Sequence, residues 1–161
     1  MARSPGVTAL PGAGQDFWEK HSGAAPVTER DVRAAASRNA VARAVLLADS
    51  LTGEQAATRL GVSESTVRHY KADRRIYGFS SGGRVRYPQW QFTEGKLLPF
   101  LGRVLQVMDR ELHPQTVTGF FTTPQPELEL EEERLTPAQW LAHGGPPGPV
   151  VRLVAELHRR S

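Results

Sequence analysis

The chain has 161 residues, of which 39% are hydrophobic, and it carries a formal net charge of +3 and no cysteine. This length suits one compact domain or two small ones. The lack of cysteine excludes disulfides, thiolate nucleophiles and cysteine-bound zinc. No apolar run approaches the roughly 18 residues of a membrane span, and residues 1–14 lack the apolar core of a signal peptide. We therefore expect a cytoplasmic protein with no membrane contact.

Charge is distributed unevenly along the chain. Residues 51–103 hold nine basic and four acidic residues, whereas residues 104–161 hold five basic and eight acidic ones. This asymmetry suggests a nucleic-acid-binding face in the middle of the chain and a different task at its end.

The first part of the chain predicts a flexible segment followed by a helix. Residues 1–27 are rich in Gly, Ala, Pro and Ser and are expected to lack fixed structure. Thr28 and Asp31 then have the spacing of a capping box. Apolar residues recur at helical spacing after them, which predicts a helix over residues 29–48.

Two short helices and a hairpin are predicted next. Thr52 caps the first helix and Gly61 ends it, while Ser63 caps the second, which extends to about residue 72. Residues 76–79 and 84–87 then flank a Ser-Ser-Gly-Gly turn, and the second arm alternates basic and apolar residues. This pattern predicts a β-hairpin.

The remaining residues predict a small helical domain. We expect a helix over residues 97–108 with Pro99 in its first turn, and a short helical segment starting at His113. Residues 122–134 are predicted to be an exposed connector, and two helices follow, from Thr136 and over residues 149–159. The predicted fold is mainly α, with domain boundaries at residues 1–27, 28–92 and 93–161.

Residues 53–70 carry the most informative motif. Ala57 is small where two helices would cross, Gly61 permits a sharp turn, and Ser63 caps a second helix with an outward N-terminus. The stretch resembles the helix-turn-helix superfamily of bacterial regulators. The resemblance implies DNA binding, with the second helix in the major groove and the hairpin as a wing. An ordinary helical hairpin is the alternative.

The side chains of this region fall into three predicted roles. Arg68 is the candidate for a guanine contact because its planar fork matches O6 and N7, and nearby side chains could touch other bases. Basic residues after the second helix are predicted to contact phosphates, and those of the hairpin the backbone or a minor groove. The predicted DNA-contacting residues are Ser63, Glu64, Ser65, Arg68, His69, Lys71, Arg74, Arg75, Arg84 and Arg86.

A second resemblance covers roughly residues 87–157. It rests on the segments 86–92, 112–114, 120–124, 135–145 and 150–153. Their order resembles bacterial antitoxins with a C-terminal toxin-binding domain, especially the partners of RES-domain toxins. The resemblance implies a type II antitoxin that represses its own operon and neutralises a toxin that consumes NAD; a ribonuclease-type toxin is the alternative.

The C-terminal apolar residues have two interpretations. Trp140, Leu141, Val150, Leu153 and Leu157 could form a toxin-binding or dimerisation face, or the core of the helical domain. We expect a homodimer. The alternative function is a stand-alone winged helix-turn-helix regulator or an excisionase-like protein whose C-terminal helices only dimerise it.

The sequence offers little for catalysis. The five histidines are scattered without a metal-binding spacing, and the acidic run 127–133 lacks the pattern of a calcium loop. No phosphate loop follows a strand. We expect no enzyme activity, no metal and no cofactor.

Overall fold

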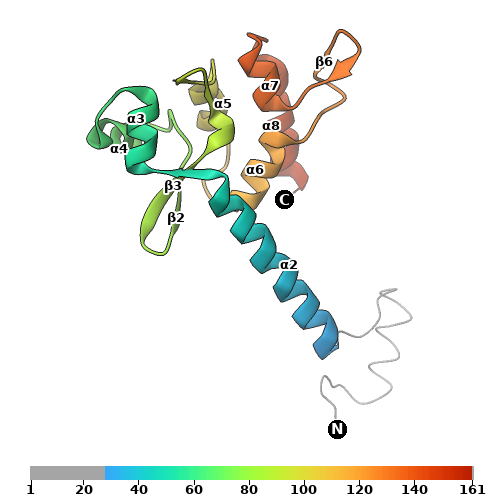
Figure 1. The fold of residues 1–161 in the computed structure, drawn as a ribbon. Helices are drawn as coiled ribbons and strands as arrows, with labels where there is room; N and C mark the ends of the chain where they lie inside the picture. Colours follow the sequence, from blue (N-terminus) through green and yellow to red (C-terminus); the bar gives the residue numbers. More distant parts are fainter. Residues whose placement is uncertain (1–27, 161) are drawn as a thin grey trace. The chain divides into compact units, whose positions relative to one another are not determined.

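The structure is a computed structural model that describes residues 28–160. The predicted flexible segment, residues 1–27, lies outside the described residues. The chain divides into two compact units, Met1–Val41 and Ala42–Ser161. Seven α-helices and three small antiparallel sheets make up the described part (Figure 1), which confirms a mainly α fold.

Helix α2 (Glu29–Ala48) supplies every described residue of the first unit except Thr28, and its last residues belong to the second unit. Its start is a reciprocal capping box, as predicted. The Asp31 amide donates to Thr28 Oγ1 over 3.1 Å, and the Thr28 amide donates to Asp31 Oδ2 over 3.2 Å. Two of the amides that a helix start leaves unpaired are thereby satisfied.

The second unit opens with a strand and two short helices. Strand β1 (Ser50–Thr52) leads into α3 (Gly53–Leu60), and α4 (Glu64–Ala72) follows. Thr52 caps α3 through a second capping box, and Gly61 ends it at a φ of 70°, in the left-handed region. These helix bounds confirm the sequence prediction.

The predicted hairpin is present within a three-stranded sheet, but its first arm begins at Phe79 rather than at residue 76, and Ser80 and Ser81 belong to that strand and not to the turn. Strand β2 (Phe79–Ser81) pairs antiparallel with β3 (Arg84–Pro88), and both turn glycines have positive φ. Strand β1, which was not predicted, pairs with the other edge of β3, so that Leu51 lies opposite Tyr87. The hairpin is therefore joined to the start of α3 through β1.

The predicted helix over residues 97–108 is wrong at its start. After the short 3₁₀-helix η1 (Gln89–Gln91), strand β4 (Phe92–Thr93) pairs with β5 (Lys96–Leu97), and α5 spans only Leu101–Val107. Pro99 lies before the helix, not in its first turn. The reason is local: proline disfavours helical backbone at the residue before it, and the β4–β5 pairing holds Leu97 extended.

Four further elements complete the second unit: α6 (Pro114–Thr122), the hairpin β6 (Glu129–Leu130) and β7 (Glu133–Arg134), α7 (Pro137–Ala142) and α8 (Gly148–Arg160). The predicted connector over residues 122–134 is largely exposed, as expected, but it contains the short β6–β7 hairpin and one buried residue. Leu128 is buried, and its carbonyl accepts a 2.7 Å hydrogen bond from the Leu135 amide. This anchor holds the acidic hairpin, whose turn residues remain exposed.

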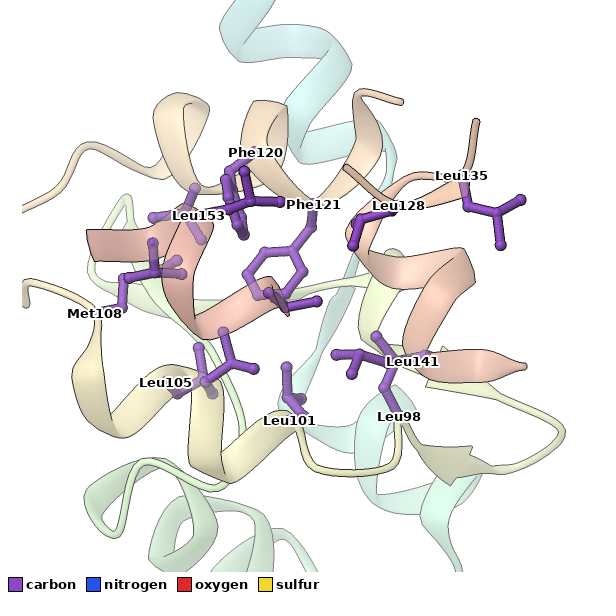
Figure 2. Close-up of a cluster of buried hydrophobic side chains, with 14 residues drawn as sticks. Leu98, Leu101, Leu105, Met108, Phe120, Phe121, Leu128, Leu135, Leu141 and Leu153 are labelled. Atoms are coloured by element: carbon purple, nitrogen blue, oxygen red, sulfur yellow. The ribbon is translucent and has the colours of Figure 1, made fainter. Parts of the chain in front are cut away.

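Two hydrophobic clusters stabilise the second unit. The smaller joins α3, α4 and the sheet through Leu51, Ala56, Val67, Ile76 and Tyr87. The larger is built from residues after 97, and Figure 2 shows Phe121 among leucines from surrounding elements. The two clusters fall on either side of the predicted boundary at residue 92, although both belong to one compact unit.

Candidate nucleic-acid interface

Apolar residues on the inward faces of α3 and α4 hold this helix pair against the sheet. Ala56, Ala57 and Val67 are buried against the sheet. The turn between the helices is closed by the Val62 amide, which donates to the Ala57 carbonyl over 3.0 Å. Since the inward faces are fixed in this way, the orientation of α4 is set by apolar packing and by the Gly61 turn.

The opposite face of α4 is exposed at its N-terminal end. Ser63 caps the helix by accepting a 3.1 Å hydrogen bond from the Thr66 amide. The four residues that the sequence predicted on this face, Glu64, Ser65, Arg68 and His69, are all exposed, and so is the cap Ser63. A capped N-terminus with exposed polar side chains can meet both base edges and phosphate oxygens.

A cleft of about 460 Å³ lies between the start of α3, the outer face of α4 and β3. Its walls hold Arg68 of α4, Arg84 and Arg86 of β3, and the carboxylates of Glu54 and Glu64. Within residues 28–160, no ion pair shorter than 4.0 Å joins these charges. The structure thus brings together four of the ten predicted DNA-contacting residues. We call this the arginine cleft.

Tyr87 lies at the wall of the arginine cleft, and the charges of the cleft affect the pKa of its phenol. Burial raises the pKa of the Tyr87 phenol, the charge of Arg68 lowers it, and that of Glu64 raises it. The Nε of Arg86 is enclosed by protein and has no hydrogen-bond partner among the described residues. Arg68 and Arg84 are exposed, and among the described residues no ion pair within 4.0 Å neutralises the arginines of this cleft.

The C-terminal end of α4 carries a second group of cations. Lys71 and Arg74 line a cleft of about 220 Å³ together with Asp109 and Arg110, which follow α5. We call it the α4 C-terminal cleft. The sequence analysis predicted Lys71 and Arg74 but missed Arg110, because no local pattern indicates that a residue so far along the chain returns to α4.

Arg74 occupies an unusual backbone conformation. Its φ is 57°, and the Arg75 amide donates to the Tyr70 carbonyl over 2.8 Å while the Arg74 amide donates to that of Lys71 over 3.0 Å. This hydrogen-bond pair is the Schellman motif, whose left-handed position is usually glycine. An L-residue with a side chain costs roughly 1 kcal/mol there.

The last predicted cation, Arg75, is placed by an aromatic ring. Its guanidinium carbon lies 4.3 Å from the centre of the Tyr70 ring, within the range of a cation–π contact. The side chain is exposed. Arg75 is thus positioned beside α4 and remains accessible.

The predicted toxin-binding residues lie mainly in the core. Leu141, Val150 and Leu153 are buried in the larger cluster, so these three do not form an exposed partner face. Trp140 and Leu157 are only partly buried, and the Trp140 indole donates to the Pro146 carbonyl over 2.8 Å. Three of these five residues therefore belong to the core of the helical part of the chain.

Gln91 is a structural residue that the sequence analysis missed. Its side chain is buried, accepts from the Tyr77 amide over 2.8 Å and donates to the Tyr77 carbonyl over 2.7 Å. A third bond runs from the side-chain amide to the Pro88 carbonyl over 3.2 Å. Gln91 therefore fixes the segment between α4 and the hairpin.

Other kinds of site have little support in residues 28–160. None of the helices there combines the length and apolar character that a membrane span requires. That part of the chain also holds no group of three or more His, Asp or Glu side chains arranged for a metal ion.

Comparison with known proteins gives one likeness. No protein-family model matches the chain, and no curated protein matches it. The NMR structure of Rv2175c resembles it with a TM-score of 0.52, over 67% of this chain and 80% of that one, at 23% sequence identity. At this identity the likeness concerns the fold alone.

Proposed function

We propose that this protein binds double-stranded DNA as a winged helix-turn-helix. In this arrangement α3 and α4 form the helix-turn-helix, α4 enters the major groove, and the β2–β3 hairpin is the wing. Arg68, Ser65 and His69 contact base edges, while the hairpin arginines contact the backbone or an adjacent minor groove.

The arginine cleft is the observation that carries the proposal. Arg68 from the helix and Arg84 and Arg86 from the hairpin line one concave surface. These three cations from two elements outnumber the carboxylates of Glu54 and Glu64 in the cleft and form no tight ion pair with them, which suits the binding of a polyanion. An ordinary helical hairpin would not require this convergence.

We propose the role of a DNA-binding regulator ahead of the more specific antitoxin role. Three of the five residues proposed for a toxin face are core residues. Neutralisation of a toxin, whether RES-type or ribonuclease-type, and repression of the protein's own operon stay predictions. Homodimer formation is also a prediction; it would require an inverted-repeat site with half-sites one or two helical turns apart.

Selection of duplexes from a random library, followed by Arg68→Ala, tests the proposal. We expect an enriched sequence, and we expect Arg68→Ala to reduce discrimination against a substituted base by about 1–3 kcal/mol. Arg134→Ala is the matched control, because it removes the same charge from an exposed position on β7. Binding constants would be measured by fluorescence anisotropy.

Two outcomes would contradict parts of this proposal. A library without any enriched duplex would argue against sequence-specific DNA binding. An equal loss for Arg68→Ala on enriched and scrambled duplexes would leave DNA binding intact but remove Arg68 from base recognition.

A further inference from the structure

The α4 C-terminal cleft brings together parts of the chain that are distant in sequence. Lys71 and Arg74 come from the end of α4, and Arg110 comes from the loop after α5. The wall between them includes Gly78, where an added Cβ would lie 3.1 Å from Lys71 Cδ. The lysine stem is therefore packed against the base of the hairpin, which limits where its ammonium can go.

The charges of this cleft are unbalanced. Three cations face one carboxylate, that of Asp109, and Asp109 Oδ1 already accepts a 2.8 Å hydrogen bond from the Glu111 amide. No ion pair shorter than 4.0 Å joins Asp109 to the three cations in the described chain. Burial lowers the pKa of Arg74 and the positive charge of Arg110 lowers it further, while the charge of Asp109 opposes the shift only in part. An anion placed between them would relieve this repulsion.

The backbone of Arg74 is a second and independent observation. The left-handed position that it occupies needs no side chain, and glycine fits it without strain. Strained residues of this kind gather at functional sites. At Arg74 the strained position directs a guanidinium to the cleft.

Residues of α4 line both the α4 C-terminal cleft and the arginine cleft. Glu64 and Arg68 line the arginine cleft, and Lys71 lines the α4 C-terminal cleft. Residues spaced by four and then three positions lie on one face of a helix. The two clefts therefore follow each other along the same side of α4, where a single duplex can reach both.

We propose that the α4 C-terminal cleft binds a backbone phosphate of the DNA held by α4, with Arg110 as a phosphate-binding residue contributed by the C-terminal part of the chain. This inference rests on the proposed function. The loop that carries Arg110 is held in place by α8, since the Asp109 amide donates to His158 Nε2 over 2.8 Å. The C-terminal helices thus take part in DNA binding by positioning a cation.

The test compares Arg110→Ala and Arg74→Gly with the control Arg134→Ala in the full chain. The probe is a random-sequence duplex, and the association constant is measured over a range of salt concentrations. The plot of log K against log salt has a negative slope. Each test variant should reduce the magnitude of this slope by about 1, as the loss of one phosphate contact does. Arg134→Ala should leave the slope unchanged.

Thermal melting separates binding from folding. Arg74→Gly should melt about 2 °C higher than the wild type, because the strain is relieved, although it binds DNA more weakly. Arg110→Ala should melt as the wild type does, since the side chain is exposed.

The outcomes distinguish this inference from the function on which it rests. A wild type that binds DNA while Arg110→Ala and Arg74→Gly keep its salt slope would overturn the phosphate site and leave the proposed function standing. A wild type that binds no duplex would remove both.

Discussion

At the scale of single residues, Gln91 stabilises the segment that lies between the two hydrophobic clusters of the second unit. Its amide group pairs with both polar groups of the Tyr77 backbone, as a neighbouring strand would. Tyr77 and the nearby Trp90 pack against the larger cluster, whereas Ile76 belongs to the smaller one. A buried polar side chain is tolerated here because its oxygen and its nitrogen both have partners.

Replacement of Gln91 should therefore be costly. Gln91→Leu keeps much of the volume but leaves the partly buried amide and carbonyl of Tyr77 without their partner, which should lower the free energy of unfolding by about 1–3 kcal/mol. Urea denaturation followed by circular dichroism measures the change. Gln89→Leu is the control, since Gln89 lies in the same 3₁₀-helix but is exposed. Similar losses for the two variants would contradict the role given to Gln91.

The residues that sequence analysis found and missed differ in the range of their interactions. The capping boxes at Thr28, Thr52 and Thr136 were predictable, because each joins residues three positions apart. Gln91 contacts Tyr77 across fourteen positions. Arg110 meets Lys71 and Arg74 only because α5 returns the chain to α4. Such contacts depend on tertiary packing and have no local sequence pattern.

At the scale of elements, the same distinction explains which boundaries were predicted. Helices α2, α3 and α4 have strong caps or glycine ends, and their bounds agree with the sequence analysis. The stretch 97–108 has helical periodicity, but a β pairing at Leu97 and Pro99 delay the helix to Leu101. Strands of two or three residues, such as β1, are too short to show a periodicity.

Two glycines in or beside helices should respond to alanine in opposite ways. Gly61 has positive φ, so Gly61→Ala should destabilise the protein by roughly 1 kcal/mol through backbone strain alone, because nothing lies within 4 Å of the added carbon. Gly119 lies inside α6 and also faces open space, so Gly119→Ala should stabilise by about 0.5–1 kcal/mol.

Thermal or urea unfolding of the two variants checks both signs in one experiment. If Gly61→Ala proved neutral or stabilising, the turn between α3 and α4 would not require the left-handed conformation, and the defined angle between these helices would lose its explanation.

At the scale of the whole molecule, the charge distribution and the clefts agree. Six of the nine basic residues of 51–103 lie on α4, on the hairpin and directly after α4, and the other three lie on α3, β5 and α5. Arg110 adds a cation from beyond this stretch. The apolar C-terminal residues fill a core that holds the loop after α5 in position. We infer that the second unit works as one DNA-binding body.

The salt dependence of DNA binding tests this account most directly. The association constant of the full chain for a 30-base-pair duplex would be measured between roughly 50 and 200 mM salt. Contact with at least four phosphates predicts a loss of affinity of about 100-fold over this range, with a steep linear slope of log K against log salt. Absence of binding, or an affinity that does not change with salt, would contradict the proposed DNA-binding face.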